Sequence, residues 1–135
     1  MKHKITGMAP LLMVYDMQTS LAFYCNVLGF NLIESAGPQD DIGWVLLRLN
    51  DIELMLNTQY EKTDRPDNQE LLRNDHHGDV CLYFACNDID GLYQSLKSKD
   101  IALKEPYITG YGWQALDLTD PDGFKLSFHK PMHTF

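Results

Sequence analysis

The sequence predicts an α+β fold made of two successive βαβββ modules, whose mixed sheets form a curved groove. Each half of the chain carries one amphipathic helical segment among short strand-like segments, in the same order. An aspartate opens the helical segment of each half, at Asp16 and Asp88, and a tryptophan lies in the third element of each, at Trp44 and Trp113. These separations, 88 − 16 = 72 and 113 − 44 = 69, are nearly equal and indicate an internal repeat.

Composition is typical of one globular domain over residues 1–135, because 44% of the residues are hydrophobic and 22% are charged. The chain has no apolar run of membrane-spanning length and no evident signal peptide, so we expect a cytoplasmic protein with no membrane partner. Three cysteines without CxxC spacing fit a reducing compartment. The net charge of −8 argues against nucleic acid and weakly favours cationic ligands, although solubility alone explains it.

Module one is expected to span about residues 9–57. Residues 11–16 are a short apolar run typical of a buried strand, and a helix is expected after them. Thr19 or Ser20 is a candidate N-cap, and Gly29 is a plausible end of this helix. The side chains expected on its buried face are Leu21, Tyr24, Cys25 and Leu28. Three strands are predicted next, at residues 31–36, 43–49 and 52–57.

Residues 58–79 separate the two modules and are polar and highly charged, with Pro66 and Gly78 as breakers. We expect a solvated linker here, with at most one helical turn at QELLR. The adjacent histidines of DHHGD (75–79) cannot easily face one ion from an extended loop, so this cluster is interpreted as solvated rather than metal-binding.

Module two is expected at about residues 80–130 and repeats the order of module one. It contains a strand at 80–87 and a helix at 88–100 whose apolar face consists of Ile89, Leu92, Tyr93 and Leu96. Three strands are predicted after it, at residues 102–107, 113–119 and 124–129. The sequence DPDG (120–123) is a tight turn before the last of these strands. His129 and His133 flank Pro131, where fraying is expected.

The predicted strands can be divided into two faces, because successive side chains of a strand alternate across a sheet. One face of each strand is apolar and is expected to pack against the helices. The other carries aromatic side chains with scattered polar groups, the composition of a ligand groove or of a face covered by a second subunit. The residues expected to line the groove are Trp44, Arg48, Glu53, Met55, Tyr83, Trp113, Asp117 and Ser127.

Three stretches, YDMQTSLAFYCNVLGF, NDIDGLY and YGWQALDLTDPDGFKLSF, resemble the glyoxalase, bleomycin-resistance and extradiol-dioxygenase superfamily, also called the vicinal oxygen chelate superfamily. The similarity extends from about Ala9 to Phe128. The motif D-x-x-x-S-x-x-F-Y-x-x-V-L-G-F, followed about ninety residues later by D-P-D-G, is specific for this fold. It indicates little about activity, since the fold serves several chemistries as well as simple binding.

The resemblance also implies where metal ligands would fall, because metal-dependent members bind a divalent ion from four strands. The four positions fall on Ala9, Glu53, Cys81 and Ser127. Alanine has no donor atom, and Ser127 occupies the place of a carboxylate ligand. Because metal affinity is a sum over ligands and geometry, we expect no divalent metal, and no other cofactor is predicted.

The resemblance therefore favours the bleomycin-resistance branch, whose members are metal-free dimers that bind a cationic drug in aromatic-lined grooves. We expect a homodimer that sequesters a small organic molecule, cationic or aromatic, as antibiotic-resistance proteins of this branch do. Many relatives carry Arg-Glu before the D-P-D-G turn, whereas this chain has Gln114 and Ala115, so the ligand is expected to differ.

An enzyme of the same fold is the alternative, either a lyase or isomerase like glyoxalase I or a dioxygenase, with a divergent site around Glu53. Its candidate catalytic residues are Glu53, Tyr83 and Cys81. Each has a simpler interpretation: Glu53 as the ion-pair partner of Arg48, and Cys81 as a small buried side chain. A third possibility is a partner-binding module that keeps the fold without a pocket.

Overall fold

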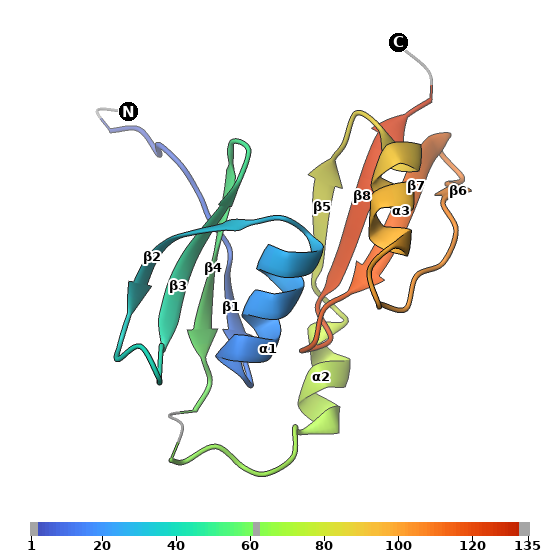
Figure 1. Ribbon diagram of the computed structural model, residues 1–135. Helices are drawn as coiled ribbons and strands as arrows, with labels where there is room; N and C mark the ends of the chain where they lie inside the picture. The colour runs from blue at the N-terminus through green and yellow to red at the C-terminus, as the bar shows by residue number, and fades with distance from the viewer. Residues whose placement is uncertain (1–2, 61–62, 133–135) are drawn as a thin grey trace. The chain divides into compact units, whose positions relative to one another are not determined.

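The computed structural model describes residues 3–60 and 63–132, except for the side chain of Leu72. The chain divides into two compact units, Met1–Asp67 (unit one) and Asn68–Phe135 (unit two). Each unit holds a four-stranded mixed sheet with a helix against one face (Figure 1). The strand orders, β1-β4-β3-β2 and β5-β8-β7-β6, are equivalent, so the α+β fold with a repeated βαβββ pattern is confirmed.

Unit one is built on a sheet with one parallel and two antiparallel pairings. Its strands are β1 (Leu11–Val14), β2 (Asn31–Ala36), β3 (Trp44–Leu49) and β4 (Ile52–Thr58). β1 pairs in parallel with β4, which requires a crossover, and helix α1 (Met17–Leu21) begins this crossover. The helix continues as a π-helix over Ala22–Val27, and Gly29 follows it with a positive φ of 92°.

The start and the buried face of this helix differ from the sequence prediction. The N-cap is Asp16, whose carboxylate accepts a hydrogen bond from the Thr19 hydroxyl at 2.5 Å, so Thr19 and Ser20 lie inside the first turn. The buried side chains are Met17, Ser20, Phe23 and Tyr24, whereas the predicted Leu21, Cys25 and Leu28 are half-buried. The reason is the π-helix, because i→i+5 bonding changes which side chains share a face.

Unit two repeats the arrangement of unit one. Its elements are α2 (Leu71–His77), β5 (Cys81–Ala85), α3 (Ile89–Lys97), β6 (Tyr107–Ile108), β7 (Trp113–Thr119) and β8 (Lys125–Pro131). α3 begins at Asp88, whose side chain accepts a hydrogen bond from the Gly91 N–H, and it lies against one face of the sheet (Figure 1). The strand predicted over 102–107 is mostly absent: β6 contains only Tyr107 and Ile108, after Pro106, which has no N–H to donate.

The segment predicted as a solvated linker contains helix α2, which is fixed to the DPDG turn. The Nδ1 atom of His77 lies 2.6 Å from the carbonyl oxygen of Asp122, and its ring stacks on Phe124 at 4.1 Å. Gly123 has a φ of 90°, and a Cβ atom there would lie 2.3 Å from the carbonyl oxygen of Asn74. The two histidines are thus on a helix rather than on an extended loop, and His77 is a packing residue of unit two.

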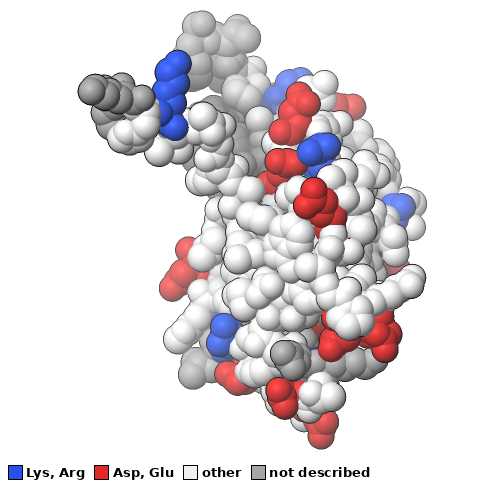
Figure 2. Space-filling model, turned by 90° about the vertical axis from the view of Figure 1, so that its left-hand side faces the viewer, with Lys and Arg blue, Asp and Glu red and all other residues white. Residues whose placement is uncertain are grey.

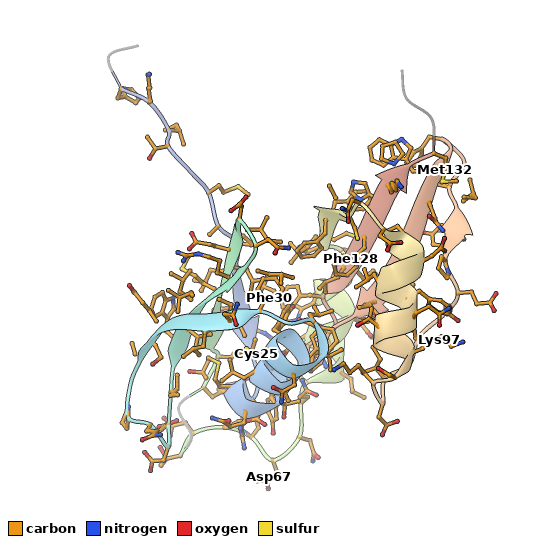
Figure 3. All side chains as sticks on the ribbon, turned by 45° about the horizontal axis from the view of Figure 1, so that its top comes forward. Cys25, Phe30, Asp67, Lys97, Phe128 and Met132 are labelled. Carbon is orange, nitrogen blue, oxygen red and sulfur yellow. The ribbon has the colours of Figure 1, made fainter. Side chains whose placement is uncertain are left out.

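Each unit has its own hydrophobic core between its sheet and its helix (Figure 3). In unit one the buried residues include Leu12, Val14, Tyr24, Phe30, Val45, Leu47, Leu54 and Leu56. In unit two they include Ile89, Leu96, Leu116, Leu118, Leu126 and Phe128. The predicted alternation is confirmed for Val45, Leu47, Leu54, Leu56, Leu116 and Leu118. The predicted packing residues Leu49, Leu82 and Phe84 are only half-buried, and Ile52, at the first position of β4, is 43% exposed.

Charge on the surface follows the composition. In the view of Figure 2, acidic side chains are scattered over a mostly uncharged face, and basic side chains are few. This agrees with the net charge of −8. Within the described part of the chain, no helix has the length and hydropathy needed to cross a membrane.

Candidate functional site

The face of the second sheet opposite α3 carries four of the predicted groove residues. Ser127 of β8 is in register with Tyr83 of β5 on one side and Asp117 of β7 on the other. Trp113 begins β7 and points to the same face as Asp117, because the two are separated by an even number of residues. The sheet thus brings together Tyr83, Trp113, Asp117 and Ser127.

Four aromatic side chains on this face each contact two of the others. We call them the Trp113 cluster: Tyr83, Tyr111, Trp113 and His129. The His129 ring lies 4.8 Å from the Trp113 ring, nearly parallel to it, and 4.8 Å from the Tyr83 ring. Tyr111 places its ring edge-on to Trp113 at 5.5 Å, and its hydroxyl lies 3.3 Å from that of Tyr83. Such contacts supply a broad, polarisable surface suited to flat organic molecules.

A carboxylate lies beside the cluster. The Tyr107 hydroxyl donates a hydrogen bond of 2.7 Å to Oδ2 of Asp117. This hydrogen bond, with slight desolvation and the negative charge of Asp117, raises the pKa of Tyr107 to about 12. Tyr107 therefore remains a donor at neutral pH and fixes the position of the Asp117 carboxylate on this face.

The electrostatics of this face disfavour negative charge. The hydrogen bond with Tyr111 is the main reason why the pKa of Tyr83 is raised, and the charge of Asp117 adds to the effect. A phenolate at Tyr83 is thus opposed by a carboxylate on the neighbouring strands. An anionic ligand group would meet the same repulsion, whereas a neutral or cationic group would not.

His129 has an unusual polar environment. Its Nδ1 atom is buried and has no hydrogen-bond partner among the described residues. A buried unsatisfied nitrogen costs about 1–3 kcal/mol, so the stacking of both neighbouring rings must offset this cost. The prediction that His129 frays with the C-terminus was wrong, because the residue belongs to β8; His133 lies outside the described residues.

Ser127 and Cys81 are two of the four positions that the sequence resemblance implies for metal ligands. Ser127 is 5% exposed, between Tyr83 and Asp117. Cys81 is exposed, so its prediction as a small buried side chain was wrong. Partial desolvation and the negative charge of Asp117 raise the pKa of Cys81. The positive charge of Lys125, which is paired with Cys81 on the neighbouring strand, acts in the opposite direction but is the smaller effect. The thiolate needed by a nucleophile or a metal ligand is therefore disfavoured.

Unit one carries the remaining predicted groove residues on the face opposite its helix. Oε2 of Glu53 accepts hydrogen bonds from Nε and Nη2 of Arg48, at 3.1 and 2.7 Å, so the expected ion pair is confirmed. Trp44 lies opposite Asn57, and Met55 lies opposite Leu46. Ala9, the remaining position of the implied metal site, precedes β1 and is half-buried.

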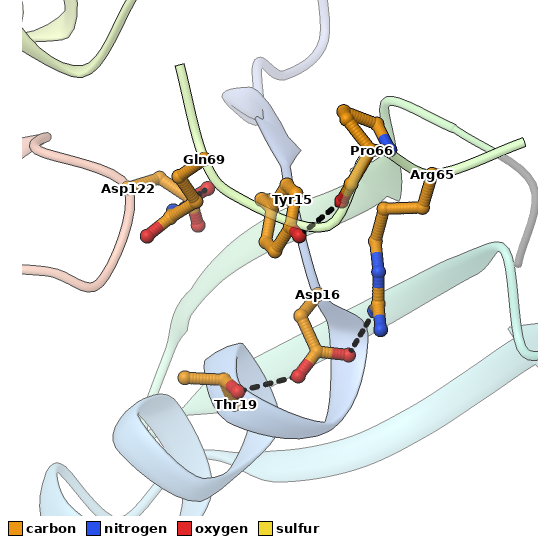
Figure 4. Close-up of polar contacts among 7 residues, drawn as sticks. All are labelled: Tyr15, Asp16, Thr19, Arg65, Pro66, Gln69 and Asp122. Carbon is orange, nitrogen blue, oxygen red and sulfur yellow. Dashed lines mark hydrogen bonds and ion pairs between the residues drawn. The ribbon is translucent and has the colours of Figure 1, made fainter. Parts of the chain in front are cut away.

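A pocket of about 130 Å³ lies in unit one where β1 ends and α1 begins. Arg65 from the connecting segment lies in its wall, 2.7 Å from Asp16 and over the ring of Tyr15 at 5.0 Å (Figure 4). The Tyr15 hydroxyl donates to the carbonyl oxygen of Pro66. Burial opposes ionisation of Asp16, but hydrogen bonds from Thr19 and Arg65 and the charge of Arg65 outweigh it and lower its pKa. These contacts fasten the segment to unit one.

The residues expected to line the groove did not include Tyr107, Tyr111 or His129, although the structure places all three beside Trp113 or Asp117. Tyr107 and Tyr111 were not assigned to the groove, because the segment before β7 was interpreted as a plain strand. A signal was present in YITGYGW, where two glycines place aromatic residues around a turn. Across residues 3–60 and 63–132, no group of three or more His, Cys, Asp or Glu side chains is arranged to hold a metal ion.

Comparison with known proteins agrees with this architecture. No curated protein matches the chain. One similar solved structure is a bleomycin-binding protein complexed with bleomycin, which is 22% identical in sequence and has a TM-score of 0.69. The match covers 93% of this chain and 98% of that chain. A bleomycin resistance determinant encoded on the transposon Tn5 has 23% identity, coverage of 95% and 100%, and a TM-score of 0.70.

An antibiotic-binding protein, TnmS3 from Streptomyces sp. CB03234, has 21% identity, coverage of 96% and 99%, and a TM-score of 0.64. At these identities the three likenesses show a shared fold. The model of the Glyoxalase/Bleomycin resistance protein/Dioxygenase superfamily matches residues 5–128, which run from before β1 into β8 and include Tyr83, Tyr111 and Trp113. The chain therefore belongs to the Glyoxalase/Bleomycin resistance protein/Dioxygenase superfamily.

Proposed function

We propose that this protein binds and sequesters a small organic molecule, aromatic or cationic, without a metal ion. The observation that carries the proposal is the stack of Trp113 on His129 beside the Tyr107–Asp117 pair. A broad aromatic surface with one fixed carboxylate is suited to a flat molecule that is neutral or positively charged. The structural likeness to a protein complexed with bleomycin and to TnmS3 lends support at the level of the fold.

Metal independence is the second part of the proposal. Two of the four family positions, Ala9 and Ser127, provide no carboxylate, imidazole or thiolate. Glu53 is engaged by Arg48, and the pKa of the Cys81 thiol is raised. Elemental analysis of the purified protein, before and after soaking in zinc, nickel, manganese and iron, tests this part. One equivalent of metal per chain would contradict it.

Binding is favoured over catalysis by the state of the candidate catalytic side chains. A general base built on Glu53 would first have to leave Arg48, and Tyr83 and Cys81 both have raised pKa values. Turnover of a glutathione hemithioacetal or a catechol that is lost in Glu53→Ala would reverse this preference. The proposal also includes a homodimer in the cytoplasm, and the free thiols of Cys25, Cys81 and Cys86 fit a reducing compartment.

Titration calorimetry with bleomycin and with a panel of planar aromatic cations tests the binding function. Trp113→Ala should weaken binding by about 2 kcal/mol, roughly thirtyfold, since central aromatic anchors dominate such sites. Tyr93→Ala is the matched control, because Tyr93 lies on α3, where it contacts Lys97. If no compound binds, or if both variants bind as the natural protein does, the Trp113 cluster is not the binding site.

A further inference from the structure

Tyr111 is mounted on a rigid turn but has an exposed side chain. Its turn joins β6 to β7 and is closed by hydrogen bonds from the Thr109 N–H to the Trp113 carbonyl, 2.8 Å, and from the Gly112 N–H to the Thr109 carbonyl, 2.9 Å. Gly112 has a φ of 86°, which fixes the backbone in a conformation that suits glycine. The side chain of Tyr111 is nevertheless 58% exposed.

The contacts of this side chain with the described residues are weak. Its ring meets Trp113 at an edge, with the planes at 74°, and its hydroxyl lies 3.3 Å from that of Tyr83, which is itself 59% exposed. This distance is longer than that of an ordinary O–H···O hydrogen bond. Rotation of an exposed side chain about χ1 is fast, on the order of nanoseconds, and needs no change in the backbone of the turn.

The surface beneath Tyr111 is more firmly built. Trp113 is half-buried and stacks on His129, and His129 also contacts Tyr83. When the Tyr111 side chain rotates away, Trp113 loses the ring that contacts it and the Tyr83 hydroxyl loses the hydroxyl beside it. The phenol of Tyr111 therefore occupies the position that a flat hydroxylated ring would take.

We propose that Tyr111 is a movable cover over the other three members of the Trp113 cluster, and that the ligand which displaces it is an uncharged planar aromatic compound with a hydroxyl group. The ligand ring replaces the Tyr111 ring against Trp113, and its hydroxyl replaces that of Tyr111 at Tyr83. Carboxylated aromatic compounds are disfavoured next to Tyr83, because the negative charge of Asp117 acts there. Lys125, a cation on this face, is paired with Cys81 at the other end of β5 from His129. This inference rests on the proposed binding function and names its ligand class.

The test compares 2-naphthol, naphthalene and 2-naphthoate by titration calorimetry on the natural protein and on two variants. Tyr111→Ala should bind 2-naphthol about three- to tenfold more tightly, since the competing side chain is gone. Tyr111→Phe keeps the ring and loses the hydroxyl, so its gain should be smaller. 2-Naphthoate should bind at least about tenfold more weakly than 2-naphthol, and naphthalene should lie between the two.

A second readout is independent of any ligand. The chain has two tryptophans, so Trp44→Phe leaves Trp113 as the only tryptophan, whose emission is excited selectively at wavelengths that tyrosine does not absorb. In this background Tyr111→Ala should increase the acrylamide quenching of Trp113 about twofold or more, since an aromatic side chain that covers part of the indole is removed. Tyr93→Ala, on α3, should leave both the quenching and the naphthol affinity unchanged.

The outcomes separate the two proposals. If 2-naphthol binds, Trp113→Ala weakens it, and Tyr111→Ala weakens it or leaves it unchanged, then Tyr111 is a fixed wall and the inference is overturned while the binding function stands. If none of the three probes, nor bleomycin, binds the natural protein or Tyr111→Ala, both proposals fall.

Discussion

Asp117 determines the charge of the ligand face of unit two. It accepts the Tyr107 hydroxyl at 2.7 Å and contributes to the raised pKa values of Tyr107, Tyr83 and Cys81. Its hydrogen bond is the main cause only for Tyr107, whereas the Tyr111 hydroxyl acts first on Tyr83 and desolvation acts first on Cys81. Neutral phenols remain hydrogen-bond donors, so the effect of Asp117 is to favour the donor form of Tyr107.

Replacing this carboxylate gives the first prediction. In Asp117→Asn the pKa of Tyr107 should fall from about 12 towards its ordinary value of 10, because the hydrogen bond to a charged acceptor is lost. NMR titration of protein labelled with 13C at the tyrosine Cζ position measures this directly. A Tyr107 resonance that still titrates near 12 in the variant would show that Asp117 is not the cause.

The same pair predicts a pH dependence of stability. Because the folded-state pKa of Tyr107 is raised, the folded state favours the protonated phenol, and this stabilisation is complete below pH 10. It should disappear as the pH rises towards 12, so the difference in urea midpoint between the natural protein and Tyr107→Phe should shrink over this range. A difference that stays constant from pH 8 to about 12 would contradict the assignment.

At the scale of elements, the contact between α2 and the DPDG turn is so close that it leaves no room for a side chain at Gly123. Gly123→Ala should lower the free energy of unfolding of unit two by at least about 2 kcal/mol, because its positive φ is strained for alanine and the new methyl group would meet the Asn74 carbonyl. Gly110→Ala is the matched control: a Cβ atom there meets nothing within 4 Å, and a change within about 0.5 kcal/mol is expected. Urea unfolding followed by Trp113 emission in the Trp44→Phe background measures both. Equal effects of the two substitutions would refute the role of this close approach.

The contact of Asp16 with Thr19 and Arg65 joins the start of α1 to the connecting segment. Asp16→Asn should destabilise unit one by about 1 kcal/mol at neutral pH, because it removes an ion pair and the negative charge at the N-terminus of α1. The lowered pKa of Asp16 means that this stabilisation is present above its ordinary value of 3.8 and is lost as the pH falls below it.

Glu53→Gln provides the control for this prediction. It removes the exposed ion pair with Arg48 but no charge at a helix end, so we expect a change within about 0.5 kcal/mol. Urea unfolding followed by Trp44 emission in a Trp113→Phe background isolates unit one. An effect of Asp16→Asn that persists unchanged at pH 3 would show that the carboxylate charge is not responsible.

At the scale of the whole molecule, the connection between the units is fastened at both ends. Tyr15 and Asp16 hold Pro66 and Arg65 in unit one (Figure 4), and the Gln69 side chain donates to Pro121 and Asp122 in unit two. Between these anchors lie Asp67, labelled in Figure 3, and Asn68, both exposed.

Insertions into this connection test how the two units depend on it. Adding Gly-Ser-Gly-Ser between Asp67 and Asn68 should change the stability of either unit by less than about 1 kcal/mol, because loop-closure entropy grows slowly with length. The same four residues between Asp120 and Pro121 should cost more than about 3 kcal/mol, since they separate the buried Asp120 from the N–H groups of Asp122 and Phe124. If both insertions lower the stability by the same amount, the connection between the units contributes to stability and does more than link them.

Sequence patterns correctly predicted the features that depend on residues close together along the chain. Alternation placed Leu54 and Leu56 in the core, and Asp88 marked the start of α3. What the patterns missed depends on partners far apart in sequence. Helix α2 is too short to be stable alone and is held through His77 by Asp122, 45 residues later.

The same reason applies to the site. Trp113, Tyr83 and Asp117 were predicted on the ligand face because each strand alternates. Tyr111 joins them only through a turn that brings its hydroxyl to that of Tyr83, 28 residues away. Positions on strands follow from the period of two residues, whereas positions on turns depend on backbone angles that a single sequence specifies weakly.

The pairing of equivalent strands shows that the two halves differ on one side of the sheet and agree on the other. With Trp44 matched to Trp113, Arg48 corresponds to Asp117, Glu53 to Ser127 and Met55 to His129. The helix-facing residues of the same strands, such as Leu47 and Leu116, are aliphatic in both halves. The two sides of one repeated scaffold therefore carry separate tasks. For an engineer, this means that the recognition surface of one half can be redesigned while the interior that folds it is left untouched.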